Sequence, residues 1–260
     1  MKVKINIKKS LKKNASDYYE KGKTAKKKRE KLEEEIKKTE KLLKKEEGKP
    51  SILKKKVRIK REKRWYERFR WFFTSEGKLV IAGRNAKQND ILYARYLGDN
   101  DLFFHADIKG APATILKGGV TASEKEKQET AQFAASYSSA WKEGYASVDV
   151  YAVKKEQVGK YAPGGYVSKG GFTLKGEREW FRDTSLGLVI YVEDGIIKVF
   201  PGEKQDAKKG AKTKIVKILP GNEEKGKIAK KIAQLLGADA DLDGILQVLP
   251  QGKSSIKKMD

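Results

Sequence analysis

The stretch that decides the fold runs from Arg64 to Ala111 and reads RWYERFRWFFTSEGKLVIAGRNAKQNDILYARYLGDNDLFFHADIKGA. Its short apolar runs at 79–82, 101–106 and, just beyond, 113–116 predict strands. Between them Ile91, Leu92 and Tyr96 recur at helical spacing and predict a helix over 86–97. Since strands and helices mix without strict alternation, we expect an α+β body, a mixed β-sheet with packed helices.

The elements beyond this stretch fit the same class. Ser123 and Glu126 form a capping-box pattern at the start of a helix expected over 123–142. Alternating residues at 147–153 predict a strand, and 186–192 with 196–200 predict a hairpin around Asp194-Gly195. The C-terminal part should hold a strand over 214–219 and helices over 223–236 and 242–248.

The N-terminal region has a different pattern. Residues 2–7 alternate as a short strand, and a helix follows from about Leu11 to Glu47, ended by Gly48-Lys49-Pro50. Apolar side chains on this helix follow 4-3 steps and form a narrow seam suited to a partner helix. A second basic segment, 53–70, supplies that partner, so we expect a projecting helical hairpin or coiled coil before the body. We expect three parts: the hairpin at 1–63, the α+β domain at 64–202, and a linker with a small C-terminal segment at 203–260.

Positive charge is concentrated near the N-terminus. Residues 1–70 hold 29 Lys+Arg and 11 Asp+Glu, a net of +18 out of +24 for the whole chain. A polyanion is the expected partner of such a segment, and the steady excess favours RNA over a merely solvated face. A membrane is not expected, since the basic helix lacks a wide apolar face.

Several classes of protein are excluded by what the sequence lacks. It has no cysteine, so disulfides and thiolate metal sites are ruled out, which fits a cytoplasmic location. It has no run of about 20 apolar residues that could span a membrane. No phosphate-binding loop with its lysine is present, so we expect no ATP or GTP hydrolysis, no cofactor and no catalytic residues.

Several blocks of the sequence resemble the NFACT family. Residues 64–72 and 79–89 are similar to the opening of its NFACT-R domain, and 105–111, 137–141 and 158–165 to later blocks of that domain. Residues 14–20 resemble the start of the family's coiled coil, and 214–230 its NFACT-C signature. The family's N-terminal domain and helix-hairpin-helix module have no counterpart in these 260 residues.

The resemblance implies a function in ribosome-associated quality control. Family members bind the large ribosomal subunit and recruit tRNA for template-free tailing of stalled nascent chains. The implied partners are therefore tRNA, large-subunit rRNA and the large subunit itself. Two positions depart from the family pattern, which usually has Asp where Asn85 stands and His where Lys109 stands. These changes remove an acid and add a fixed cation, which favours RNA binding over acid–base chemistry.

The candidate binding residues lie mostly around the Gly83-Arg84-Asn85 turn. Arg84 is suited to a phosphate, and Gln88 and Asn89 to sugar or base edges, although the turn can also be a simple helix cap. His105 is suited to a stack or hydrogen bond. The full set of predicted nucleic-acid contacts is Tyr66, Arg68, Arg70, Arg84, Asn85, Gln88, Asn89, His105, Asp107 and Lys109.

The aromatic cluster has two readings. Trp65, Phe69 and Phe72 follow helical 4-3 spacing, which favours core packing over base stacking. Tyr66 and Arg70 would then lie on another face and be free to contact RNA. The glycine pairs at 164–165 and 170–171 are tight turns by default, but could also let a phosphate backbone approach.

Two alternatives to an RNA-binding module remain at this point. The first is an RNA-modifying or phosphoryl-transfer enzyme that uses Arg84, His105 and Asp107, which would require one deep pocket holding all three. A lone His–Asp pair is a poor metal site, so no metal is expected there. The second is a scaffold whose coiled-coil seam self-associates.

Overall fold

The computed structural model describes residue 6 and residues 9–47, 62–162, 165–202, 214–237 and 240–257. The chain divides into two compact units, Met1–Arg61 and Glu62–Asp260, and each is described by itself. The α+β class is confirmed: a long N-terminal helix belongs to the first unit, and antiparallel sheets packed with helices make up the second.

In the described part of the first unit, residues Leu11–Glu47 form helix α1, as predicted. At 1.5 Å per residue its 37 residues span about 55 Å. Asn14 holds the chain that enters the helix, because its side-chain amide donates to the carbonyls of Asn6, Lys9 and Ser10. The predicted seam is exposed: Leu32 is 57% and Ile36 54% accessible.

Several N-terminal predictions lie outside the described residues. These are most of the strand at 2–7, the stop at 48–50 and the segment 51–61. The described part of the second hairpin segment, residues 62–70, was wrongly predicted to be part of a long helix. Residues Trp65–Arg68 form a short 3-10 helix, η1, and strand β1 begins at Arg70. The Glu67 carboxylate accepts from the backbone N–H of Arg64 at 3.1 Å, and Phe69 N donates to Tyr66 O at 2.9 Å, which closes the turn before an α-helix can propagate.

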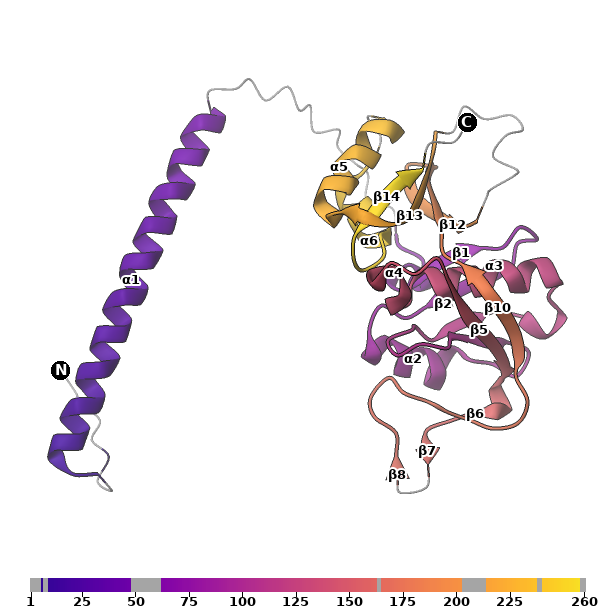
Figure 1. Cartoon of the computed structure of the whole chain (residues 1–260), viewed down its shortest axis with the longest axis horizontal. Helices are drawn as coiled ribbons and strands as arrows, with labels where there is room; N and C mark the ends of the chain where they lie inside the picture. Colours follow the sequence, from indigo (N-terminus) through magenta and orange to yellow (C-terminus); the bar gives the residue numbers. More distant parts are fainter. Residues whose placement is uncertain are drawn as a thin grey trace. The chain divides into compact units, whose positions relative to one another are not determined.

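The second unit is built on a six-stranded, fully antiparallel sheet (Figure 1). Its order is β1-β2-β4-β3-β5-β10. The strands are β1 Arg70–Phe73, β2 Leu79–Ala82, β3 Leu102–Ala106, β4 Thr114–Leu116, β5 Ser147–Lys154 and β10 Glu179–Ser185. Strands β2 to β5 match the predicted positions, whereas β1 and β10 were not predicted.

Alternation along the strands sends side chains to two separate cores. In β3, Leu102, Phe104 and Ala106 join the core that includes helix α3, Glu124–Ser136. Phe103 instead joins a second core with Leu92 of helix α2, Ala86–Tyr96. The period of two therefore places α3 and α2 on opposite faces of the sheet, and His105, next in register to Phe103, shares the α2 face.

The helix predicted over 123–142 is interrupted. Its capping box at Ser123 and Glu126 is present, but α3 ends at Ser136 and a short helix, α4, runs from Ser139 to Glu143. Ser138 has an extended backbone and its hydroxyl caps α4 by accepting from Ala140 N. The hydroxyl of Ser136 bonds the backbone of Gly187. These serines satisfy local polar groups in a way that a continuous helix would not allow.

A second antiparallel sheet, of order β12-β11-β13-β14, covers the other side of α3. Its strands are β11 Leu188–Glu193, β12 Ile196–Pro201, β13 Ile215–Glu223 and β14 Ser254–Lys257, and helices α5 Lys225–Leu236 and α6 Leu242–Val248 pack beside them. The β11–β12 hairpin turns at Asp194 and Gly195, both with positive φ, as the sequence predicts. The expected boundary at residue 203 thus falls between two strands of one sheet. The linker at 203–213 lies outside the described residues.

Four further short strands, β6 to β9, belong to this unit, and Figure 1 shows β6, β7 and β8 in its lower part. Strand β6 Val158–Gly159 pairs with β9 Thr173–Leu174, and β7 Tyr161–Ala162 pairs with β8 Gly165–Tyr166. The loop 168–172 that follows β8 runs back toward α2, where Gly170 meets Ala86.

Candidate nucleic-acid interface

A cavity of about 590 Å³ opens at the N-terminus of α2. It lies where β2 and β3 end and where the loop 168–172 passes. Its lining residues are Arg70, Gly83, Arg84, Asn85, Ala86, Asn89, His105, Lys109, Gly110, Ala111, Pro112, Tyr137, Tyr151, Ser168, Lys169, Gly170, Gly171, Phe172 and Gln251.

The cavity is strongly one-signed in charge. Arg70, Arg84, Lys109 and Lys169 line it together with His105, and none of these described lining residues is Asp or Glu. Asn85 and Ala86 at the N-terminus of α2 line the same space, where the helix dipole adds partial positive charge. An anion is therefore the ligand class that this cavity suits.

The loop 168–172 is fixed against α2 by Asp90. The Asp90 carboxylate accepts from Gly170 N at 3.0 Å and pairs with Lys160 Nζ at 2.5 Å. Lys160 also donates to Gly171 O at 2.6 Å. Gly170 has φ +79°, and a Cβ there would lie 2.7 Å from the Cβ of Ala86. A glycine is thus needed for the loop to close the cavity wall.

Arg84 is held by three backbone carbonyls from two separate segments. Its guanidinium donates to Arg68 O at 3.2 Å, to Phe69 O at 3.0 Å and to Gln247 O at 2.8 Å. Burial lowers the pKa of this guanidinium. Arg84 therefore joins η1 to α6 while it lines the cavity.

The amides of the turn are also engaged. Asn85 is the N-cap of α2, and its side chain accepts from Gln88 N at 3.0 Å. Gln88 accepts from Arg84 N and donates to Arg68 O. Asn89 is buried and accepts from Ala113 N at 3.2 Å. The turn thus caps the helix. Of the three amide side chains, that of Asn85 belongs to the most exposed residue, and it lines the cavity.

Arg70 lies deeper in the cavity wall. It donates through Nη1 to Gly83 O at 2.7 Å, and its guanidinium lies 4.6 Å from the ring centroid of Tyr137. Its Nε is buried without a hydrogen-bond partner among the described residues. Burial raises the pKa of the Tyr137 hydroxyl to about 12, and this hydroxyl donates to Val248 O at 2.6 Å. Arg70 thus retains donor capacity for a ligand.

His105 faces the cavity beside Tyr151. The Tyr151 hydroxyl lies 3.3 Å from His105 Nδ1. Burial lowers the pKa of His105 from its ordinary 6.5, and burial raises the pKa of Tyr151 to about 12. Both groups are therefore neutral at pH 7 and act as hydrogen-bonding or stacking groups, not as charges.

Comparison with known proteins agrees with the charge of this cavity. Residues 68–176 match the family profile described as NFACT protein RNA binding domain. The chain contains an NFACT-R domain. The cavity residues from Arg70 to Phe172 all fall within the matched range.

The chain is also homologous over most of its length to proteins of ribosome quality control. It is 39% identical to the archaeal Rqc2 homolog aRqcH of Methanocaldococcus jannaschii over 78% of this chain and 31% of that protein. It is 33% identical to the ribosome quality control complex subunit NEMF homolog of Drosophila melanogaster, over 74% of this chain and 20% of that protein. The chain is 33% identical to the ribosome quality control complex subunit NEMF of Homo sapiens, over 74% of this chain and 19% of that protein. The chain thus spans less than a third of the length of these relatives.

Four predicted contact residues of the NFACT-R domain lie away from the cavity. Gln88 was described above. Asp107 is exposed and does not line the cavity, so the pocket required by the enzyme alternative, with His105, Asp107 and Arg84 together, is not formed there. Arg68 is exposed, bonds the hydroxyl of Tyr96 and lies 5.0 Å from the ring centroid of Phe69.

The expectation that Tyr66 lies on a face free to contact RNA is wrong. Its side chain is only 7% exposed and packs against the rings of Trp65, Trp71 and Phe73. Helical spacing does not apply because η1 gives way to β1 within this cluster. Phe69 and Phe72 are buried as expected, whereas Trp65 is 47% exposed and stacks on Tyr96 at 4.8 Å.

Several cavity residues were not predicted as contacts from the sequence, among them Lys169, Tyr151 and Tyr137. Lys169 adjoins the Gly170-Gly171 pair, and a lysine beside a glycine pair is a usable signal for an anion-facing loop. Tyr151 lies opposite His105 in the β3–β5 register, which its position in an alternating strand could have indicated. Tyr137 comes from the interruption between α3 and α4, which the pattern did not show.

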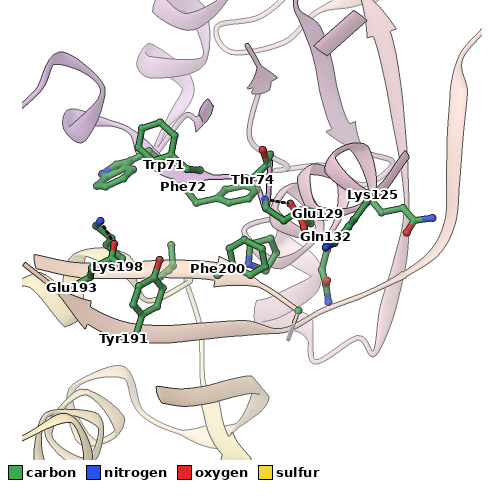
Figure 2. A pocket seen from close by; sticks show the side chains of 16 residues that line it. Trp71, Phe72, Thr74, Lys125, Glu129, Gln132, Tyr191, Glu193, Lys198 and Phe200 are labelled. Atoms are coloured by element: carbon green, nitrogen blue, oxygen red, sulfur yellow. Dashed lines mark hydrogen bonds and ion pairs between the residues drawn. The ribbon is translucent and has the colours of Figure 1, made fainter. Parts of the chain in front are cut away.

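A second cavity, of about 460 Å³, has a different character (Figure 2). It lies between β1, α3 and the β11–β12 hairpin, and rings of Trp71, Phe72, Tyr191 and Phe200 form its apolar wall. Its charges are mixed. Lys198 is paired with Glu193, and Glu129 accepts from Ser75 N at 2.8 Å. This balance does not favour a polyanion.

Among the described residues, no group of three or more His, Cys, Asp or Glu side chains is arranged to hold a metal ion. Of the helices in the described ranges, none is long and apolar enough to cross a membrane.

Proposed function

We propose that this chain is the RNA- and ribosome-binding part of a quality-control factor that acts in the cytoplasm. In this proposal it binds the large ribosomal subunit and tRNA during template-free tailing of stalled nascent chains. The ribosome forms the peptide bonds, and the chain itself carries out no chemistry. Support comes from the NFACT-R domain and from the chain's homology to ribosome quality control proteins.

The observation that carries the proposal is the cavity at the N-terminus of α2. Four Lys or Arg side chains line it, and no carboxylate is among its described lining residues. Phosphate oxygens are the natural ligands of such a site, and neutral His105, Asn85 and the ring of Phe172 supply hydrogen bonds or a stacking face for an exposed base. In this arrangement Lys109 and Lys169 are the phosphate contacts, and Arg84 shapes the wall.

Filter binding to tRNA and to purified large subunits, across a salt series, tests this function. Lys109→Ala with Lys169→Ala should weaken both complexes about tenfold and lower the salt slope by about one to two, since two phosphate contacts are lost. Lys125→Ala, at the second cavity, is the matched control and should change little. Unimpaired binding by the double variant, with an unchanged melting temperature, would remove the cavity from the interface.

The exposed seam of α1 supports a further part of the proposal. Leu32 and Ile36 are more than half exposed, so the seam is free to pack on another helix. That other helix can come from a second copy of this chain or from a partner protein. Sedimentation analysis of Leu32→Lys with Ile36→Lys tests the first case: a fall in concentration-dependent mass supports self-association, and a monomeric parent protein rules it out.

A further inference from the structure

A row of rings crosses three neighbouring strands on the α2 face of the six-stranded sheet. Trp180 of β10 is opposite Tyr151 of β5, and Tyr151 is opposite His105 of β3. The ring centroids are 5.5 Å apart for Trp180 and Tyr151, and 5.8 Å apart for Tyr151 and His105. Since His105 lines the cavity and β10 ends the sheet order, the row connects the cavity to the edge of the sheet.

Two arginines lie over the outer end of this row. The guanidinium of Arg182 is 3.9 Å from the centroid of Trp180. That of Arg178 is 5.7 Å from Trp180 and 4.8 Å from Tyr151. Positions 178, 180 and 182 are two residues apart, so they share one face of an extended chain. The result is an alternation of planar cations and rings at the sheet edge.

The outermost arginine is oriented by an acid. Arg182 Nη1 pairs with Asp149 Oδ2 at 2.6 Å, and the other carboxylate oxygen accepts from Asp183 N at 2.9 Å. The side chain of Arg182 is still 60% exposed. One of its five N–H groups is therefore used to fix the plane, and the remaining donors and the outer face stay open to solvent.

We propose that Arg178, Trp180 and Arg182 form a binding track for unpaired RNA, continuous with the cavity. This inference rests on the proposed RNA-binding function and names the RNA class as single-stranded. Unpaired bases stack on aromatic rings and guanidinium planes, whereas a duplex keeps its bases inside. The cations beside the rings meet the phosphates of the same strand.

The dimensions fit a short run of nucleotides. Three neighbouring strands place β10 about 10 Å from β3, at ~4.8 Å per strand. At the ~3.4 Å that separates stacked nucleotides, this distance corresponds to about three of them. One nucleotide would lie at the cavity, and the following ones would pass Arg178 and reach Trp180 and Arg182.

Fluorescence anisotropy with the full chain tests the track. The probes are an eight-nucleotide oligouridylate and a hairpin-free RNA duplex of the same length. Trp180→Leu and, separately, Arg182→Ala should weaken binding of the oligouridylate about 5- to 150-fold, the range of one lost base stack, and leave duplex binding nearly unchanged. Arg182→Lys should retain the salt slope and recover only part of the affinity. Arg95→Ala removes an exposed arginine of α2 and is the matched control.

The outcomes separate this inference from the function on which it rests. The track would be overturned if the Trp180 and Arg182 variants lost equal affinity for the single strand and the duplex. It would also be overturned if they lost no more affinity than Arg95→Ala. Either result leaves tRNA binding through Lys109 and Lys169 standing. Trp180 also adjoins the second core, so Trp180→Leu is interpreted at matched melting temperature. Arg182→Ala, at an exposed position, keeps the test decisive should Trp180→Leu fail to fold.

Discussion

The N-terminal segment and the α2 cavity both carry positive charge, but they carry it in different ways. Residues 1–61 hold 25 Lys+Arg and 9 Asp+Glu, a net of +16. Over residues 11–40 every Lys and Arg lies at an exposed position of one helix. Only four such residues line the cavity, where Arg70 and Arg84 are held by backbone carbonyls, and none of its described lining residues is an acid. Charge in quantity gives attraction to any polyanion, while a few positioned charges can select one.

The largest expected effect comes from removing the first of these regions. Deletion of residues 1–61, the whole first unit, should greatly weaken tRNA binding at low salt. For contacts with six or more phosphates, the log–log salt slope of the parent should be about −5, and it should flatten to about −2 in the truncated protein. Filter binding from low to physiological salt measures both values. If affinity and slope are unchanged, the N-terminal charge has no part in binding.

Arg84→Ala sharpens the comparison at the cavity wall. Because the guanidinium donates to three backbone carbonyls, its loss should cost about 2–3 kcal/mol of unfolding free energy in addition to any loss of RNA affinity. Urea unfolding followed by circular dichroism checks this. Lys87→Ala, an exposed neighbour on α2, is the control. If Arg84→Ala keeps the stability of the parent protein but loses RNA binding, then Arg84 contacts RNA and does not stabilise the fold.

Gly170→Ala tests the wall of the cavity without removing any charge. An alanine with positive φ costs about 1–2 kcal/mol, and here its Cβ would also collide with Ala86. Gly144→Ala is the matched control, since Gly144 has φ +77° and no atom within 4 Å of the added carbon. Both variants should lose similar stability from backbone strain, but only Gly170→Ala should also lose tRNA affinity. Equal binding by the two would mean that the loop does not shape the site.

The smallest effect should come from His105. Its folded-state pKa lies below 6.5 because of burial, so the folded protein binds this proton less readily than the unfolded chain. The stability contributed by neutral His105 is therefore complete above pH 6.5 and is lost as the pH falls through the folded-state pKa. Thermal melts between pH 7.5 and 4.5 should show a shallower acid decline in His105→Gln than in the parent. Parallel profiles would contradict a buried neutral His105.

Periodicity in the sequence was sufficient for most of the fold. Helices α1 and α6 and strand β2 have the predicted bounds, because their apolar spacing or their turn residues are local signals. Strand β10 could not be predicted, since its exposed, charged sequence forms a strand only by pairing with β5. The interruption of α3 depends on bonds to Gly187, which is far away in the sequence.

The candidate site was predictable to the extent that its residues are local. The Gly83–Asn89 turn and His105 are short-range motifs, and six of the predicted contact residues line one cavity: Arg70, Arg84, Asn85, Asn89, His105 and Lys109. The internal use of Gln88, Asn89 and Arg84 was not predictable, because their partners lie on or beside η1, just before β4 and on α6. Which cations remain free for a ligand is a property of the tertiary structure.

The position of α3 between the two sheets also affects how the second unit is synthesised. Phe72 of β1 contacts both Phe133 of α3 and Phe200 of β12, and Trp141 donates to the carbonyl of Lys253 at 3.1 Å and to the hydroxyl of Ser254. One face of the central helix therefore has no cover until strands from residues 188 to 257 have been translated. During vectorial synthesis this core stays incomplete until β14 has been translated, so the second unit reaches its final packing only after that point.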